Sequence, residues 1–174
     1  PHTMALVKLA NTALDRVASR RNDVIQTLAG YGDSDVICYH ADEPAELVGR
    51  QEGHWHPLRD WIRRRHGVGL TATSGIVHAA QEASALAKLG QLVAAYDDFA
   101  LTALSELTTI SGSIVIALAL GEGEIDAETA WTAAFVDELH QAELWGEDEE
   151  AAARRRRLRT DFEEALRLLE LLRA

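Results

Sequence analysis

Two short stretches of the sequence place histidines and carboxylates close enough together to suggest metal binding or proton transfer. His54 and His56 are separated by one residue, and residues 137–140 read Asp-Glu-Leu-His. A zinc site needs three or four protein ligands, and the other histidines are scattered at His2, His40, His66 and His78. Successive residues of a helix point about 100° apart, so the side chains of 137–140 should not converge. We therefore predict no metal ion and no catalytic residues at either stretch.

The glycines of residues 121–123 (Gly-Glu-Gly) do not match a phosphate-binding loop. A dinucleotide-binding loop has a third glycine and follows a strand, and a P-loop ends in a lysine and a hydroxyl residue. Both features are missing from this part of the sequence, and the acidic Glu122 and Glu124 would repel phosphate. The sequence predicts that this segment ends a helix, and we predict no cofactor.

The single cysteine, Cys38, lies in the apolar run Val36–Tyr39 and has no second cysteine with which to form an internal disulfide. Such a residue is typically a small core side chain, with a reactive thiol as the alternative. One cysteine fits a reducing compartment. The alanine- and arginine-rich composition favours the cytoplasm of a bacterium, and a mitochondrial homologue would lie in the matrix.

The charge of the chain argues against polyanionic partners. The formal net charge is −11 and the sequence pI is about 5.0, so phosphate backbones and anionic membranes are repelled. The one basic cluster, residues 154–157 with Arg159, follows seven acidic residues. We predict that Glu149 and Glu150 pair with these arginines at i,i+4 spacing, which gives a solvated face; a polyanion site is the alternative. With no run of eighteen apolar residues, we also predict no membrane insertion.

One stripe of residues has the composition of a protein interface. Glu138, Gln141, Ala142 and Trp145 follow one another at i, i+3, i+4 and i+7, which places them on one helix face. A large aromatic beside hydrogen-bonding groups is typical of protein–protein contacts. The alternative is that Trp145 packs inside the helical bundle while Glu138 and Gln141 lie at its rim. From these residues alone both interpretations stay open.

The elements that carry these residues differ between the two halves of the chain. In residues 1–78 we expect helices over 4–17 and from Ser19 to about Gly30, and strands over 35–41 and 70–73. We expect another helix from Pro44 to Glu52, interrupted at Gly53, and a further one that begins at Pro57 and ends near Gly67. Two strands are too few for a stable sheet.

Residues 79–174 are predicted to form an all-helical bundle. Apolar residues recur at helical spacing over 86–107 and 110–120, in one long helix over 126–145, and from about Asp148 to the end. The predicted fold class is mainly α: a C-terminal orthogonal helical bundle, preceded by helices and two short strands left from a truncated α+β domain. The predicted domains are 1–78 and 79–174.

Several ordered motifs then resemble one protein family. Residues 9–15 (LANTALD) and 35–47 (DVICYHADEPAEL) are followed by Gln51, Trp55, Pro57-Leu58 and Trp61, by residues 111–113 (SGS), and by Glu138, Gln141, Trp145-Gly146 and Glu149. This series resembles the assembly chaperones of the α subunit of F-type ATP synthase, over nearly the whole chain. His56 stands where the family pattern has an aspartate and His140 where an aromatic is common, so these two positions depart from it.

The resemblance implies a molecular chaperone without enzymatic activity that binds the unassembled α subunit and prevents its aggregation. It implies that Glu138, Gln141, Trp145 and Glu149 form or support the partner-binding surface, although Glu149 could instead be purely structural. It also implies a further β-rich segment before Pro1, so that the chain is a fragment, and we expect a monomer. The alternatives are a helical regulator that binds a small molecule between its helices, and a helical enzyme.

Overall fold

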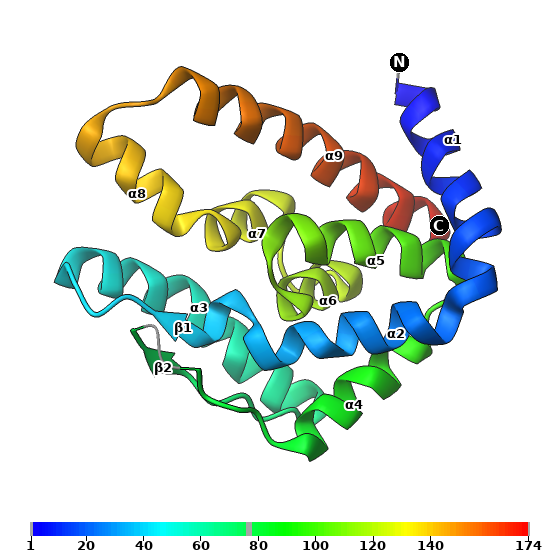
Figure 1. The fold of residues 1–174 in the computed structure, drawn as a ribbon, viewed down its shortest axis with the longest axis horizontal. Coiled ribbons are helices and arrows are strands. Elements are labelled where there is room, and N and C mark those ends of the chain that lie inside the picture. Colours follow the sequence, from blue (N-terminus) through cyan, green and yellow to red (C-terminus); the bar gives the residue numbers. More distant parts are fainter. Residues whose placement is uncertain (1, 76–77, 174) are drawn as a thin grey trace.

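A computed structural model describes residues 2–75 and 78–173 of the chain (Figure 1). Residues 1–4 were expected to be the tail of a preceding β-rich segment; Pro1 lies outside the described residues, and His2 to Met4 belong to a helix. The helices are α1 (His2–Thr12), α2 (Arg21–Gly30), α3 (Ala45–His66), α4 (Ala83–Ala94), α5 (Asp98–Ser111), α6 (Ile114–Glu122), α7 (Ala127–Ala134), α8 (Val136–Trp145) and α9 (Glu149–Arg173). A π-helical turn (Ala13–Val17) and a 3-10 turn (Ala18–Arg20) join α1 to α2.

The short helix α6 forms the centre of the molecule. All its residues from Ile114 to Gly121 are buried, as expected of a helix that is apolar on every side. It begins at Ser113, whose side chain accepts a hydrogen bond from the Ile116 backbone N–H, and ends at Gly123 with a left-handed φ of 76°. Helices α3, α5, α7 and α9 pack around it, and α9 runs alongside α5 (Figure 1).

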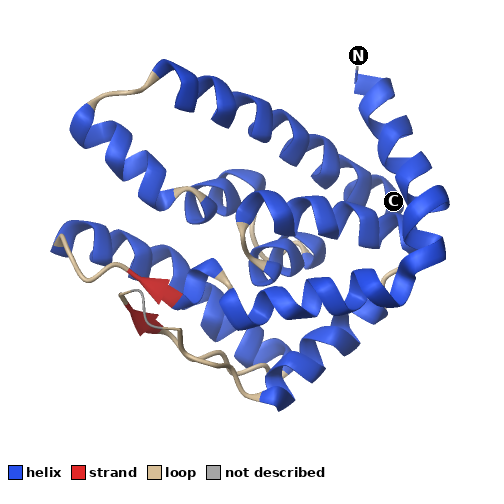
Figure 2. Cartoon of the chain, in the orientation of Figure 1, coloured by secondary structure: helices blue, strands red, loops and turns tan. Residues whose placement is uncertain are grey.

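The predicted fold class is confirmed, because helices make up nearly all the regular structure and only two short strands accompany them (Figure 2). The division at residue 78 stays a prediction. Within the described part of the chain, the helices include none with the length and hydropathy needed to cross a lipid bilayer.

The strands are shorter than predicted. Over 35–41, the Asp35 carboxylate accepts a hydrogen bond from the Ile37 N–H and starts a 3-10 turn, so that only β1 (Tyr39–His40) is extended as a strand. Strand β2 (Thr73–Ser74) pairs with it in parallel, Tyr39 opposite Thr73. Most of the expected strand 70–73 is loop, because the Gln81 side chain bonds both the N–H and the carbonyl of Thr71 in place of a neighbouring strand.

Helix α3 is continuous, so the predicted interruption at Gly53 was wrong. Pro57 lies inside the helix and, lacking an N–H, leaves the carbonyl of Gly53 without its usual partner. The packing of α3 compensates for this loss: Leu47, Trp55, Leu58 and Ile62 are all buried on one side of the helix. The C-terminal end is as predicted, with Gly67 at a left-handed φ of 67°.

The predicted helices 110–120 and 126–145 also differ from the structure. Ile110 lies in the last turn of α5, which ends at Ser111, and Gly112, at a left-handed φ of 69°, separates α5 from α6. The predicted long helix breaks at Phe135 (φ −115°, ψ 20°) into α7 and α8. A tertiary contact and a local one accompany this break: the Trp55 indole N–H donates to the Ala133 carbonyl at 2.8 Å, and Phe135 stacks on Trp131, four residues earlier.

Candidate functional site

Helix α8, which carries most of the predicted partner-binding residues, lies at the opposite end of the molecule from α1 (Figure 1). It is bounded by the break at Phe135 and by Gly146, whose φ is 84°. Helix α3 fixes its inner side. The Gln51 amide donates to Asp137 Oδ1 at 2.6 Å and accepts from the Ala41 backbone N–H at 2.8 Å, and Arg50 pairs with Glu143 at 2.6 Å.

Ion pairs with two arginines of α9 connect the outer side of α8 to that helix. Glu138 lies 3.4 Å from Arg154 and 3.7 Å from Arg155. Arg155 is largely buried and also pairs with Glu147. Glu138, predicted to face the partner, is therefore half-buried and positions α8 against α9.

The arginines do not pair with Glu149 and Glu150 as predicted; among the described residues, Arg154 and Arg155 pair with Glu138 and Glu147. Glu149 and Glu150 lie in the first turn of α9, where the helix dipole favours negative charge without any cation. Asp148 caps this turn by accepting from the Ala151 N–H at 2.8 Å. The predicted salt-bridged face exists, but its acids come from other elements.

Trp145 is the most exposed large apolar side chain of the described residues. It is 82% exposed, and the neighbouring Leu144 is 53% exposed. The other three tryptophans are buried. Trp145 therefore does not pack inside the bundle, which removes that alternative. Sequence reasoning missed Leu144, although its place beside an indole at the end of an amphipathic helix was a usable signal.

The structure brings Glu138, Gln141 and Trp145 onto one helix, with Gln141 exposed and Glu149 exposed across the bend at Gly146. Together they form a surface around the α8–α9 bend that can make apolar and hydrogen-bonded contacts. Sequence reasoning also missed that Gln51 and Arg155 hold α8 in place, because both act from other helices: Gln51 from α3, distant in sequence, and Arg155 from α9.

The residues considered for acid–base or metal chemistry point to different neighbours. Asp137 binds Gln51 and Glu138 faces α9, while His140 turns inward and is 1% exposed. His56 lies between Glu52 and Asp60 of its own helix, at 3.4 and 3.3 Å. In residues 2–75 and 78–173, groups of three or more metal-binding side chains are absent.

Cys38 is buried in the core, as predicted. Its burial, together with the nearby Asp35, raises the pKa of the thiol to about 12. At neutral pH the sulfur is therefore a protonated, apolar group, and a reactive thiolate at this position is disfavoured.

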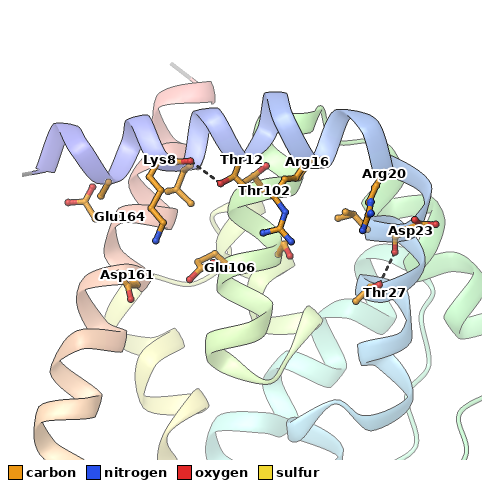
Figure 3. Close-up of a pocket in the computed structure, with 15 residues that line it drawn as sticks. Lys8, Thr12, Arg16, Arg20, Asp23, Thr27, Thr102, Glu106, Asp161 and Glu164 are labelled. Carbon is orange, nitrogen blue, oxygen red and sulfur yellow. Dashed lines mark hydrogen bonds between the residues drawn. The ribbon is translucent and has the colours of Figure 1, made fainter.

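A groove lies beneath α1 and the turns that follow it (Figure 3). It has a volume of about 450 Å³ and is open to solvent on one side. Lys8 and Arg16 reach into it from above, and Glu106 of α5 and Asp161 of α9 line the opposite wall. This groove was not predicted, although residues 9–15, one of the motifs that carry the family resemblance, contribute to its roof.

Comparison with known proteins identifies related sequences and structures. The family model described as "ATP12 chaperone protein" matches residues 1–63. The Atp12 structure from Paracoccus denitrificans is 38% identical with a TM-score of 0.94, and the match covers 98% of this chain and 73% of that one. A point mutant of the same protein gives a TM-score of 0.95 with equal coverage. A protein of Agrobacterium tumefaciens is 39% identical with a TM-score of 0.92, over 99% of this chain and 65% of that one.

Proposed function

Because the chain belongs to the ATP12 chaperone family, whose members assist ATP synthase assembly, we propose that it binds the unassembled α subunit of F-type ATP synthase and prevents its aggregation. On this proposal it acts by covering a surface, without catalysis. It binds as a monomer through the α8–α9 bend, with Trp145 at the centre and Gln141 and Glu149 beside it.

One observation carries this proposal: Trp145 and Leu144 are exposed side by side at the end of a helix whose position is fixed by its neighbours. Tryptophan is among the side chains that contribute most to protein–protein binding energy. A helix already held in place loses little conformational entropy when it binds.

The physical need for such a protein follows from assembly itself. A subunit of an obligate complex has a large apolar interface, which is exposed to self-association until its partner arrives. A protein that covers this interface and is then displaced by the partner needs only mass action, and no hydrolysis of ATP. Glu138 has an indirect part in this proposal, since it holds α8 against Arg154 and Arg155.

The test is a pull-down of purified α and β subunits with the wild-type chain and three variants. Trp145→Ala and Leu144→Ala should each reduce capture of α at least tenfold, because each truncates a central apolar contact. The matched control is Leu171→Ala, which removes a leucine of similar exposure (57% against 53%) at the far end of α9. The proposal would be contradicted if Leu144→Ala and Leu171→Ala captured equal amounts of α subunit. It would also be contradicted if the wild-type chain captured β subunit in preference to α.

The groove beneath α1 supports a second candidate function, a regulator that binds a small molecule. Its volume lies within the usual range for ligand sites, and Lys8, Arg16 and Arg20 offer cations to an anionic group on the wall opposite Glu106 and Asp161. This function would be favoured by a small anion that raises the melting temperature of the wild-type chain but not of Arg16→Gln, while capture of α is unaffected.

A further inference from the structure

The two exposed apolar residues at the end of α8, Leu144 and Trp145, are here named the docking pair. They lie next to a segment of strong negative charge, because residues 143–150 contain five carboxylates and no lysine or arginine. Two of these carboxylates are neutralised within the fold: Glu143 pairs with Arg50, and Glu147 pairs with Arg155.

The other three, Asp148, Glu149 and Glu150, are here named the acidic rim. All are exposed, and among the ion pairs within the described residues none involves them. No described cationic side chain neutralises them: the start of α9 favours their charge only through the helix dipole and the Ala151 N–H, and they stay accessible to solvent. The Asp148 side chain accepts a backbone hydrogen bond at the start of α9, which fixes the rim close to the docking pair.

The C-terminal end of α8 adds to the negative electrostatic potential around the acidic rim. A helix C-terminus carries a partial negative charge, which basic residues or a glycine cap usually compensate. Helix α3 has both, with four basic residues in its last turn and a bond from the Gly67 N–H to the Arg63 carbonyl. Helix α8 has no basic residue in its last turn, and within the described structure Gly146 donates no cap bond. The carbonyls beside the docking pair therefore still accept hydrogen bonds from cationic donors.

From these observations we infer that the docking pair and the acidic rim bind a cationic segment of the unassembled α subunit. Apolar side chains of that segment would lie against Leu144 and Trp145, and its flanking lysine or arginine residues would lie against the acidic rim. This inference rests on the proposed function and specifies which part of the partner is held. The exposed indole can stack against the apolar side chains or against a guanidinium group. The carboxylates and free carbonyls attract the flanking cations, and their field speeds the approach of a cationic segment before contact.

The charge test compares two triple variants that change the net charge equally. The rim variant carries Asp148→Asn, Glu149→Gln and Glu150→Gln, in which asparagine keeps the helix cap. The control variant carries Glu82→Gln, Glu124→Gln and Glu170→Gln, at three exposed positions: before α4, between α6 and α7, and near the C-terminal end of α9. Association with immobilised α subunit is measured at about 20 mM and about 300 mM salt, because exposed charges are screened much more strongly at the higher value.

At low salt, the rim variant should associate about tenfold more slowly than wild type, and the control variant within about twofold, since local charge steers association. High salt should remove the difference. An equal decrease in both variants would show that only the total charge matters, and no decrease in either would show that the segment bound is not cationic. Either result overturns the inference.

A model peptide separates this inference from the proposed function. The probes are a peptide of alternating leucine and lysine and its leucine–glutamate counterpart, and the readout is acrylamide quenching of tryptophan, which reports on Trp145 because the other tryptophans are buried. The lysine peptide should protect Trp145 and the glutamate peptide should not. Protection without capture of α would support the inference and reject the proposed function. If the rim variant captures α as well as wild type does, the proposed function is supported and the inference is rejected.

Sedimentation tests whether a second copy of the chain occupies the same surface. If the chain pairs with a second copy through the α9 arginines, wild type will sediment as a dimer without α and the rim variant will not, and the inference fails.

Discussion

Replacing Gln51 by methionine should loosen helix α8 and destabilise the protein. The Gln51 side chain is fully buried, and its amide joins three elements: it lies on α3, accepts from the Ala41 N–H after β1, and donates to Asp137 on α8. Methionine has a similar length and fills the same space, but it cannot make either hydrogen bond. The change therefore tests the two bonds with little effect on packing.

The magnitude follows from where the two partners lie. Asp137 is exposed, so water replaces the lost amide and the net cost is about 1 kcal/mol. The Ala41 N–H is half-buried, and an unsatisfied donor there costs about 1–2 kcal/mol. The free energy of unfolding should fall by about 2–3 kcal/mol, which for a chain of this length lowers the melting temperature by about 4–12 °C.

Urea denaturation measures the loss of stability, and amide hydrogen exchange locates it. Exchange should accelerate most in α8, because the bond between α3 and α8 is lost, and least in α6. The control Gln91→Met, at an exposed position of α4, should stay within about 0.5 kcal/mol of wild type. If Gln51→Met unfolds at the same urea concentration as wild type and α8 exchanges no faster, then α3 does not position α8 through this side chain.

Three further predictions concern single residues. Burial raises the pKa of Asp35 from 3.8 to about 6; since the folded state binds this proton more tightly than the unfolded chain, the unfolding free energy should fall by about 3 kcal/mol as pH rises from 3.8 to 6. In urea titrations the difference between wild type and Asp35→Asn should follow this change, and a difference constant with pH would refute it. Cys38, whose pKa is raised to about 12, should react with iodoacetamide at pH 8 only as fast as the protein unfolds, so rapid alkylation of the native protein would contradict its burial. Gly53→Ala should stabilise α3 by about 0.5–1 kcal/mol, because an added Cβ meets no atom within 4 Å; a lower melting temperature would be inconsistent with a continuous helix.

The elements that were predictable from sequence are those whose signals are local. The all-apolar run of α6, the helix end at Gly67 and the amphipathic α9 depend on spacing and on glycine conformation, and the structure has them close to their predicted positions. The errors have tertiary causes. Gly53 and Pro57 are helix breakers by propensity, but the buried face of α3 overrides them.

Two other errors also arise from contacts between distant residues. The strand expected over 35–41 gives way to a turn because Asp35 caps it and also accepts from the Val115 N–H at the start of α6. The break at Phe135 depends on Trp55, a residue 80 positions earlier in the chain. Pairings over such distances are not readable from a single sequence.

The same division holds for the candidate site. Helical spacing predicted that Glu138, Gln141 and Trp145 share one face. Whether the indole is buried depends on which helices pack against that face, and this required the structure. The partners of Glu138 and Arg155 come from facing helices, so spacing along α9 alone favoured the wrong acids.

Light scattering from unassembled α subunit tests the central claim most directly. Purified α, diluted from denaturant in the absence of β, should aggregate more slowly as this chain is added, with suppression complete near one chain per α subunit. Later addition of β should release α into a complex without the chaperone. If α aggregates at the same rate with and without an equimolar amount of the chain, the chain does not shield the unassembled α subunit.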